Sequence, residues 1–308
     1  MSELFTHFGL LCALAMLATL LVAGGWCRLR GVAYGSWIRL CVLGIPLAWL
    51  CSRAAYCLTN IPYYFITIEN PALMLRFWDG GYSLFGALGG LMLAAFLTAK
   101  WQHMNPGILL DGIGLGAPLG AIIERLAETG TGTGWGDAIS SEWLMPLGVT
   151  ENYWHPVYLY EAVAAFILLL VLVSWLLSRK GQIVSGDLML VFMTLYGSMQ
   201  VVLESLRDDG HMVVHHFVHV SQIIAIVLPV VALAIWSARL AKKGAKKSQL
   251  ISVWLVTIAM IGIGIRQEFA VDHPTFSLVV EYGIMAAAMA VVAIGALFIR
   301  HRANQPET

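Results

Sequence analysis

The chain has 308 residues, of which 59% are hydrophobic and only 12% are charged, and its 18 Lys and Arg balance its 18 Asp and Glu. An average soluble domain is about 25% charged, so a soluble fold could not bury this much apolar surface, whereas a lipid bilayer can cover it. The zero net charge, with no basic patch interleaved with aromatic residues, argues against a nucleic-acid-binding protein.

The hydrophobic segments predict an all-α integral membrane protein with about nine transmembrane helices. Most segments are close to the ~20 residues that cross the hydrocarbon core, and the eighth is short. The first is read as a retained helix, because Met1–His7 lacks the basic residues of a secretory signal. In chain order the segments are Phe8–Trp26, Ile38–Leu58, Tyr82–Ala99, Ile108–Ala127, Pro156–Leu177, Val184–Leu203, Phe217–Ala238, Leu250–Ile265 and Phe276–Ile299.

The basic residues predict the orientation, because Lys and Arg are enriched in cytoplasmic loops. With the N-terminus outside and the C-terminus cytoplasmic, the inner loops hold most of the 18 basic residues. These are Arg28, Arg30, Arg39, Lys100, Arg179, Lys180, Arg239, Lys242, Lys243, Lys246, Lys247, Arg300 and Arg302. The opposite orientation would place nearly all of them outside.

Five arginines remain that the topology does not require, namely Arg53, Arg76, Arg125, Arg207 and Arg266. Arg266 lies at a predicted helix end and is read as interfacial. An Arg at membrane depth costs at least ~2.5 kcal/mol on insertion scales, so it normally has a partner or a function. The other four are therefore candidates for a functional site.

The cysteines and two outer loops give weaker signals. The five cysteines show no metal-ligand spacing, which predicts buried thiols rather than a zinc site. Asn60–Gly81 is rich in aromatic residues and proline, as in a segment that lies in the membrane interface. Glu128–His155 is rich in glycine, but no Lys-Ser/Thr follows, so a nucleotide phosphate loop is not indicated. Flexible substrate-facing backbone and a plain exposed loop both remain open for it.

Several motifs, in order and at matching spacing, resemble the bacterial phosphatidylglycerol–prolipoprotein diacylglyceryl transferases. Arg76-Phe-Trp-Asp-Gly-Gly-Tyr-Ser-Leu-Phe-Gly86 is similar to the family's R-x-W-D-G-G-x-S-x-H-G block, and His155-Pro-Val-Tyr-Leu-Tyr-Glu161 to H-P-x-Q-L-Y-E. The remaining matches are Arg53 with Tyr56, Asp111 with Pro118 and Arg125, Trp135-Gly136, Tyr196-Gly197, Glu204-Ser-Leu-Arg207 and Gln222. The resemblance covers about residues 8–240 and leaves the last two helices outside it.

The resemblance implies a reaction at the outer face of the bacterial cytoplasmic membrane. The thiol of a prolipoprotein lipobox cysteine takes the diacylglyceryl group of phosphatidylglycerol, and glycerol phosphate leaves. Such a site needs cations aimed at the phosphate and help in removing the thiol proton. Arg125 and Arg207 are the candidate phosphate clamp, because Arg offers a planar fork that stays protonated. Glu161 and Glu204 are read as partners that orient these guanidiniums.

The other motif residues are candidates for binding the lipid or bracing the site. They are Arg53, Tyr56, Arg76, Asp79, Ser83, His155, Tyr160 and Gln222. An alternative stays open in which the charged residues pair only with one another and hold the helices together.

The chain departs from the family pattern at two positions that bear on proton removal. Phe85 stands where the motif has His, and Glu128 stands where it has Asn. Glu128 lies three residues from Arg125, close enough to pair with it on a helix. Such a carboxylate could weaken a phosphate clamp or act as a base, and the sequence leaves both readings open.

Histidines after Arg207 offer another base. His211, His215, His216 and His219 cluster there, and on a helix His215 and His219 would share one face. A near-neutral pKa suits proton removal. Interfacial histidines without a catalytic role remain the simpler reading, and a metal site lacks a clear carboxylate ligand.

The sequence therefore predicts a helical membrane enzyme with a central cavity. Residues 1–240 form a seven-helix transferase-like domain, and residues 241–308 add a basic loop and two helices. The predicted partners are phosphatidylglycerol and a prolipoprotein signal peptide or another acceptor, with no cofactor and no metal. Two alternatives remain: a catalytically inactive or acceptor-switched relative that binds anionic lipid or a membrane partner, and a transporter, for which the inverted repeats are missing.

Overall fold

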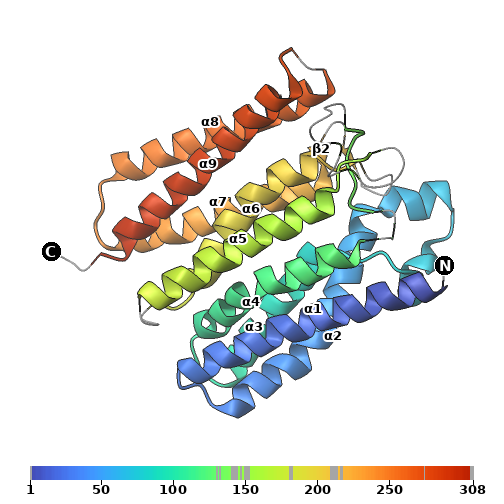
Figure 1. The fold of residues 1–308 in the computed structure, drawn as a ribbon. Coiled ribbons are helices and arrows are strands. Elements are labelled where there is room, and N and C mark those ends of the chain that lie inside the picture. The colour runs from blue at the N-terminus through green and yellow to red at the C-terminus, as the bar shows by residue number, and fades with distance from the viewer. Residues whose placement is uncertain are drawn as a thin grey trace. The chain divides into compact units, whose positions relative to one another are not determined.

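Long helices make up most of the part of the chain that the structure describes. The computed structural model describes residues 2–129, 131, 133–139, 145, 148, 153–179, 183–208, 214–215, 218–273 and 275–305. Within these residues, nine helices are long and apolar enough to cross a membrane (Figure 1). This confirms the predicted multi-pass helical membrane protein.

The chain divides into two compact units, each of which is described by itself. The first unit comprises Met1–Phe8, Glu124–Leu172 and Leu190–Thr308, and the second comprises Gly9–Ile123 and Val173–Met189. The long helices are α1 (Ser2–Leu29), α2 (Tyr34–Thr59), α3 (Leu84–Trp101), α4 (Pro106–Ala127), α5 (Val157–Ser178), α6 (Asp187–Ser205), α7 (Val220–Lys242), α8 (Lys247–Asp272) and α9 (Leu278–Ala303).

In the second unit, helices α2 and α3 pack along one another and are joined by three short helices. These are η1 (Tyr63–Thr67), η2 (Pro71–Leu75) and η3 (Phe77–Asp79). Large side chains of this connection stay exposed, including Phe65 at 55% and Trp78 at 79%. Such exposed aromatic residues suit the membrane interface that the sequence predicts for this segment.

A buried aspartate of α4 fixes the beginning of α6. Asp111 is fully buried, and its carboxylate accepts hydrogen bonds from the backbone N–H of Gly186 at 2.8 Å and of Met189 at 3.2 Å. The first N–H groups of a helix have no partner within the helix, and a carboxylate there also complements the helix dipole. The motif aspartate therefore has a structural contact in this fold.

In the first unit, α9 packs against both α7 and α8. Polar groups join the two last helices: Gln267 and Glu281 are fully buried, and Gln267 Nε2 donates to Glu281 Oε2 at 2.5 Å. Helix α8 continues to Asp272, so the prediction of a short eighth segment is wrong. The helix can include Gln267 because a carboxylate of α9 satisfies that amide.

Helix α9 also contacts the end of α6. Tyr282 Oη donates to the backbone carbonyl of Ser205 at 3.1 Å. Ser205 is the last residue of α6 and lies two positions before Arg207. The two helices beyond the family-like region are therefore bonded to the segment that carries a candidate site residue.

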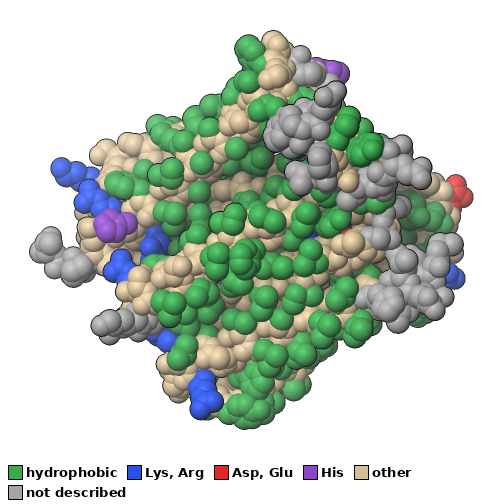
Figure 2. Space-filling model, in the orientation of Figure 1, with side chains coloured by type: hydrophobic (Ala, Val, Ile, Leu, Met, Phe, Trp, Pro, Cys, Tyr) green, Lys and Arg blue, Asp and Glu red, His purple; other side chains and the backbone are tan. Residues whose placement is uncertain are grey.

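Outward side chains of the helices are largely apolar, as contact with lipid tails requires. Figure 2 shows hydrophobic side chains along the helices on the face that it draws. On α8 the exposed fractions reach 62% at Leu255 and 61% at Ile258. Large apolar side chains exposed along a helix are normal in lipid and rare in water.

The segment before α7 corrects one sequence prediction. His215 belongs to strand β1 (Val214–His215) and His219 to strand β2 (Val218–His219), which pair antiparallel with Val214 opposite His219. The predicted shared helix face of the two histidines is therefore wrong. Valines that alternate with other residues favour extended pairing over a helix. His211 and His216 lie outside the described residues, as does the side chain of His215.

Candidate functional site

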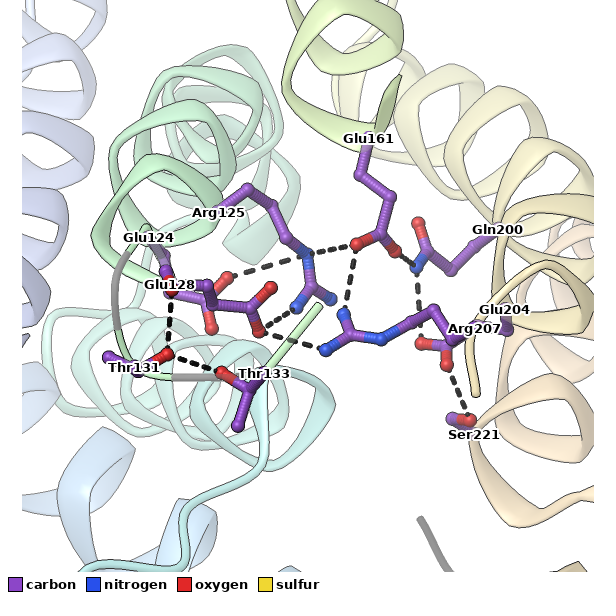
Figure 3. Close-up of polar contacts among 10 residues, drawn as sticks. All are labelled: Glu124, Arg125, Glu128, Thr131, Thr133, Glu161, Gln200, Glu204, Arg207 and Ser221. Atoms are coloured by element: carbon purple, nitrogen blue, oxygen red, sulfur yellow. Dashed lines mark hydrogen bonds and ion pairs between the residues drawn. The ribbon is translucent and has the colours of Figure 1, made fainter. Parts of the chain in front are cut away.

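Two arginines and two glutamates of the first unit form a closed ring of ion pairs (Figure 3). Arg125 lies in the last turn of α4, and Glu128 follows that helix. Arg125 Nη1 lies 2.9 Å from Glu128 Oε1, and Arg125 Nε lies 3.1 Å from Glu161 Oε2 on α5. Arg207, two residues beyond α6, reaches the same two oxygens, at 3.0 Å to Glu128 and 2.9 Å to Glu161. Each carboxylate therefore bridges both guanidiniums.

This ring is buried, so its charges interact strongly. The exposed fraction is 6% for Arg125, 6% for Glu128, 2% for Glu161 and 8% for Arg207. Burial and the neighbouring Arg125 act to lower the pKa of Arg207, but Glu161, Glu128 and Glu204 raise it above its ordinary value. Arg207 therefore stays protonated.

A second group of polar residues supports Glu161 from α6 and α7. Gln200 Nε2 donates to Glu161 Oε1 and, at 3.1 Å, to Glu204 Oε1. Ser221 Oγ donates to Glu204 Oε2 at 2.9 Å. Both oxygens of Glu161 and of Glu204 are thus hydrogen-bonded or ion-paired, which fixes the carboxylates in place.

Glu204 contacts Arg207 less directly than the sequence reading supposed. Its carboxylate bonds to the neutral groups of Gln200 and Ser221, and its backbone carbonyl lies 2.9 Å from His219 Nδ1. His219 is also the residue before α7. Its backbone N–H donates a hydrogen bond to Gln222 Oε1 at 2.8 Å. The described contacts of His219 and Gln222 thus hold the start of α7 beside the end of α6.

The glycine-rich segment packs against the chain that carries Arg207. The backbone N–H of Asp208 donates to the Trp135 carbonyl at 2.9 Å, and that of Gly136 donates to the His155 carbonyl at 2.9 Å. Both Gly134 and Gly136 are buried. At Gly134–Gly136 the reading as a plain exposed loop is therefore wrong, because this backbone is packed and hydrogen-bonded, whereas Asp137 and Ala138 are exposed.

The close approach at Gly136 gives a testable prediction. A Cβ at this position would lie 2.2 Å from the backbone carbonyl oxygen of Leu206, the residue before Arg207. We expect Gly136→Ala to displace this backbone and to lower the activity of the candidate site about 10- to 100-fold, since small shifts of a charged group at a site have large effects.

The matched control is Gly283→Ala on α9, where a Cβ would meet nothing within 4 Å. Alanine in a helix is intrinsically favourable, so this variant is expected to keep its activity and its melting temperature. Equal activities of the two variants would show that the packing at Gly136 does not position Arg207.

Several predicted binding residues lie in the second unit, where Arg53 braces the backbone. Arg53 is 3% exposed, and its guanidinium donates to the carbonyls of Leu73 at 3.1 Å, Met74 at 3.2 Å, Gly81 at 3.2 Å and also Gly80. Its centre lies 5.9 Å from the Tyr56 ring centroid. Of the two roles that the sequence left open for Arg53, these contacts support bracing.

The remaining residues of that motif have varied surroundings. Ser83 Oγ caps α3 by accepting from the Gly86 N–H at 3.2 Å, and its carbonyl accepts from Ser52 Oγ at 2.8 Å. Arg76 is exposed, and the side chain of Asp79 lies outside the described part. Phe85 is the second residue of α3. Its phenyl ring stands where the family motif has an imidazole.

His155 and Tyr160 form a pair at the start of α5 in the first unit. His155 Nδ1 lies 3.0 Å from Tyr160 Oη. Burial lowers the pKa of His155 below its ordinary value, although Asp137 opposes this effect. The ring is therefore neutral at pH 7, and it can hold the hydroxyl of Tyr160, the residue directly before Glu161 on α5.

Sequence reasoning missed Gln200, Ser221 and Glu124. Glu124 Oε2 lies 3.6 Å from Arg125 Nε, so a third carboxylate borders this arginine. A signal existed for two of them, because Gln200 lies four residues before Glu204 on an apolar helix and Glu124 adjoins a buried Arg. Polar residues inside a membrane helix normally have a partner. Ser221 carried no such signal.

Comparison with known proteins identifies relatives of one kind. The family model of prolipoprotein diacylglyceryl transferase matches residues 4–238. The phosphatidylglycerol–prolipoprotein diacylglyceryl transferase of Bacillus licheniformis is 29% identical over 242 residues, which is 75% of this chain and 87% of the relative. That of Clostridioides difficile is 30% identical over 206 residues, 67% of this chain and 79% of the relative. The matched region ends within α7, so α8 and α9 lie beyond the family model.

Proposed function

The chain belongs to the prolipoprotein diacylglyceryl transferase family, and from this membership we propose that it moves a diacylglyceryl group from phosphatidylglycerol to the cysteine thiol of a prolipoprotein. Glycerol phosphate is the second product. The family name supports the substrates, and the nine apolar helices support a reaction within a membrane. The bacterial cytoplasmic membrane is the proposed location, with the site in its outer half.

One observation carries this proposal: two buried arginines, one in the last turn of α4 and one just beyond α6, converge on the same pair of carboxylate oxygens. The phosphate of the leaving glycerol phosphate gains negative charge as the C–O bond breaks. Two guanidinium forks directed at one place can stabilise that charge, and more strongly in a dry site than in water. Arg125 and Arg207 are accordingly proposed to bind the phosphate.

The other residues of the ring have a positioning role in this proposal. Glu161 holds both guanidiniums, and Gln200 and Glu204 hold Glu161 through the bonds already described. Tyr160 directly precedes Glu161 on α5, its partner His155 lies just before that helix, and both are proposed to face the lipid. Arg53 and Tyr56, with Arg76, Asp79 and Ser83, are proposed to shape the lipid-binding part of the second unit.

The domain boundary near residue 240 also remains a proposal. Residues 1–240 are proposed to carry the reaction, since the family model ends at residue 238. The α8–α9 hairpin is proposed to support it, because Tyr282 Oη bonds to the Ser205 carbonyl near Arg207.

The direct test is a transfer assay with the purified full chain. Phosphatidylglycerol that carries the label in its headgroup glycerol is supplied in mixed micelles with a peptide that contains a lipobox cysteine. We expect labelled glycerol phosphate to be released and the peptide to gain a diacylglyceryl thioether, in equal amounts. A peptide with serine in place of the cysteine is the control and should give neither product.

Other outcomes distinguish the alternatives. Lipid binding without release of glycerol phosphate would indicate a catalytically inactive relative. Release with another thiol or hydroxyl acceptor, and none with the lipobox peptide, would indicate a different acceptor. Either result would refute the proposed reaction.

A further inference from the structure

Glu128 occupies the point at which the two arginines converge. Its Oε1 lies 2.9 Å from Arg125 Nη1 and 3.0 Å from Arg207 Nη2. One oxygen between two guanidiniums is also the arrangement that an oxygen of a bound phosphate would adopt. The carboxylate and a phosphate therefore compete for the same donors.

The second carboxylate oxygen of Glu128 differs from the first in its hydrogen bonding. Oε2 is buried and has no hydrogen-bond partner among the residues that the structure describes. Leaving a buried carboxylate oxygen without a donor is unfavourable, so its presence requires an explanation. A Cβ on Gly134 would lie 2.4 Å from this oxygen, so only a glycine allows the backbone to approach it.

The other three carboxylates of the cluster are less suited to exchange a proton. Both oxygens of Glu161 and of Glu204 are bonded. Glu124 Oε2 also has no hydrogen bond among the described residues, but its ion pair is with Arg125 and not with Arg207, at 3.6 Å. Among these four carboxylates, Glu128 combines contact with both arginines and an oxygen without a hydrogen bond, and it lies beyond the last residue of α4, where the backbone no longer continues the helix.

The charges of the cluster add a constraint. Glu124, Glu128, Glu161 and Glu204 surround two guanidiniums. A phosphodiester anion that entered this group would face a surplus of negative charge, and this surplus grows as the phosphate becomes a monoester. Like charges in a buried site are strongly unfavourable, so one carboxylate must lose its charge during the reaction.

We propose that Glu128 accepts the proton of the acceptor thiol and, on doing so, releases Arg125 and Arg207 to the phosphate. This inference rests on the proposed function and assigns the base for that same site. It also explains how the chain can act with Phe85 in place of an imidazole.

The step balances in atoms and charge. The thiol proton moves to Glu128 Oε2, and the sulfur electron pair forms the C–S bond with the glyceryl carbon. The C–O bond breaks with its electrons passing to the phosphate oxygen, which gains one negative charge. Glu128 loses one negative charge at the same time, so the total charge facing the two guanidiniums does not change.

The test compares wild type with Glu128→Gln in the labelled-phosphatidylglycerol assay from pH 6 to pH 9. Glutamine keeps the shape of the side chain but takes no proton. We expect kcat to fall about 100-fold at pH 7, while KM for phosphatidylglycerol stays equal or falls, because the competing carboxylate is gone. The remaining rate should rise about tenfold per pH unit up to the thiol pKa of ≈8.5, since only preformed thiolate can react.

A pH profile must be interpreted together with the charged or titratable groups that the structure describes in and around this cluster. These groups are Glu124 and Arg125 of α4, Tyr158 and Glu161 of α5, Tyr196 and Glu204 of α6, Arg207 beyond α6, and His219 before α7. Glu124→Gln is the matched control, because it removes a neighbouring carboxylate that does not reach Arg207. It is expected to keep the pH profile of the wild type.

The outcomes separate this inference from the function on which it rests. A wild type that releases no glycerol phosphate refutes the proposed function. A wild type that is active, with Glu128→Gln unchanged in kcat and pH profile, refutes the inference alone. A variant in which kcat falls and KM rises with an unchanged pH profile also refutes it, because that pattern indicates only a structural role. Glu128→Asp, which keeps a carboxylate, should retain the wild-type pH profile at a reduced rate.

Discussion

Replacing Arg207 by alanine is expected to lower the rate of diacylglyceryl transfer by about 1,000-fold or more. Loss of one arginine that stabilises the charge on a departing phosphate has effects of this order. Arg207 also bridges Glu128 at 3.0 Å and Glu161 at 2.9 Å, so its removal leaves two buried carboxylates facing Arg125 alone. The measurement is the initial rate of glycerol phosphate release under saturating phosphatidylglycerol.

Arg207→Lys tests whether charge alone is sufficient. An ammonium group is a single point of charge and cannot reach two carboxylates in the forked geometry of a guanidinium. We expect the transfer rate of Arg207→Lys to exceed that of Arg207→Ala by no more than about tenfold. An alanine variant that folds, elutes as the wild type does and keeps more than a tenth of the activity would contradict the assignment of Arg207 to the phosphate.

Glu161→Gln is expected to lower activity on the order of several hundred-fold through the position of the arginines. Glu161 Oε2 receives Arg125 Nε at 3.1 Å and Arg207 Nη1 at 2.9 Å, while Oε1 accepts from Gln200. A neutral amide cannot balance two guanidiniums, and truncating one partner of a buried charge pair costs about 2–5 kcal/mol. We expect the melting temperature to fall together with kcat.

Glu204→Gln is the matched comparison for this prediction. Glu204 is on the neighbouring helix and equally buried, but its carboxylate bonds to the neutral groups of Gln200 and Ser221. An amide oxygen can still accept one of these bonds, so the expected loss is below about tenfold. Equal losses in the two variants would show that contact with the guanidiniums is not what makes Glu161 important.

The helices were predictable because hydrophobic length is a strong signal. Runs of about 20 apolar residues satisfy their own backbone hydrogen bonds only as helices in lipid. Nine such segments were expected, and nine are found among the described residues. The eighth was placed too short, with Arg266 at its end, whereas Glu281 of α9 pairs with Gln267 and lets the helix continue.

The central pair of the site was also predictable. Arg125 and Arg207 stand out because an arginine at membrane depth requires an explanation, and the expected pairing of Glu128 with Arg125 is confirmed at 2.9 Å. The closed ring was not predictable, because it depends on how α4, α5 and α6 bring separate side chains together. The spacing of residues in a sequence does not predict that one carboxylate will bridge two arginines that are far apart in the chain.

The prediction that His215 and His219 share a helix face failed because this segment is extended and not helical. The interval between His215 and His219 matches a helix face, but Val214 and Val218 lie in paired strands. A spacing of four residues has meaning only if the segment is helical. The bracing contacts of Arg53 were equally hidden, since backbone carbonyls accept its hydrogen bonds and any residue type provides those.

The amide–carboxylate bond between α8 and α9 has a consequence for biogenesis. Gln267 and Glu281 are each fully enclosed, and Gln267 Nε2 and Glu281 Oε2 each have their partner on the other helix. A helix that entered lipid by itself would expose such a group at a cost of about 2.5 kcal/mol or more for a charged carboxylate. The translocon is therefore expected to release the two last helices as one hairpin, after the ribosome has completed both.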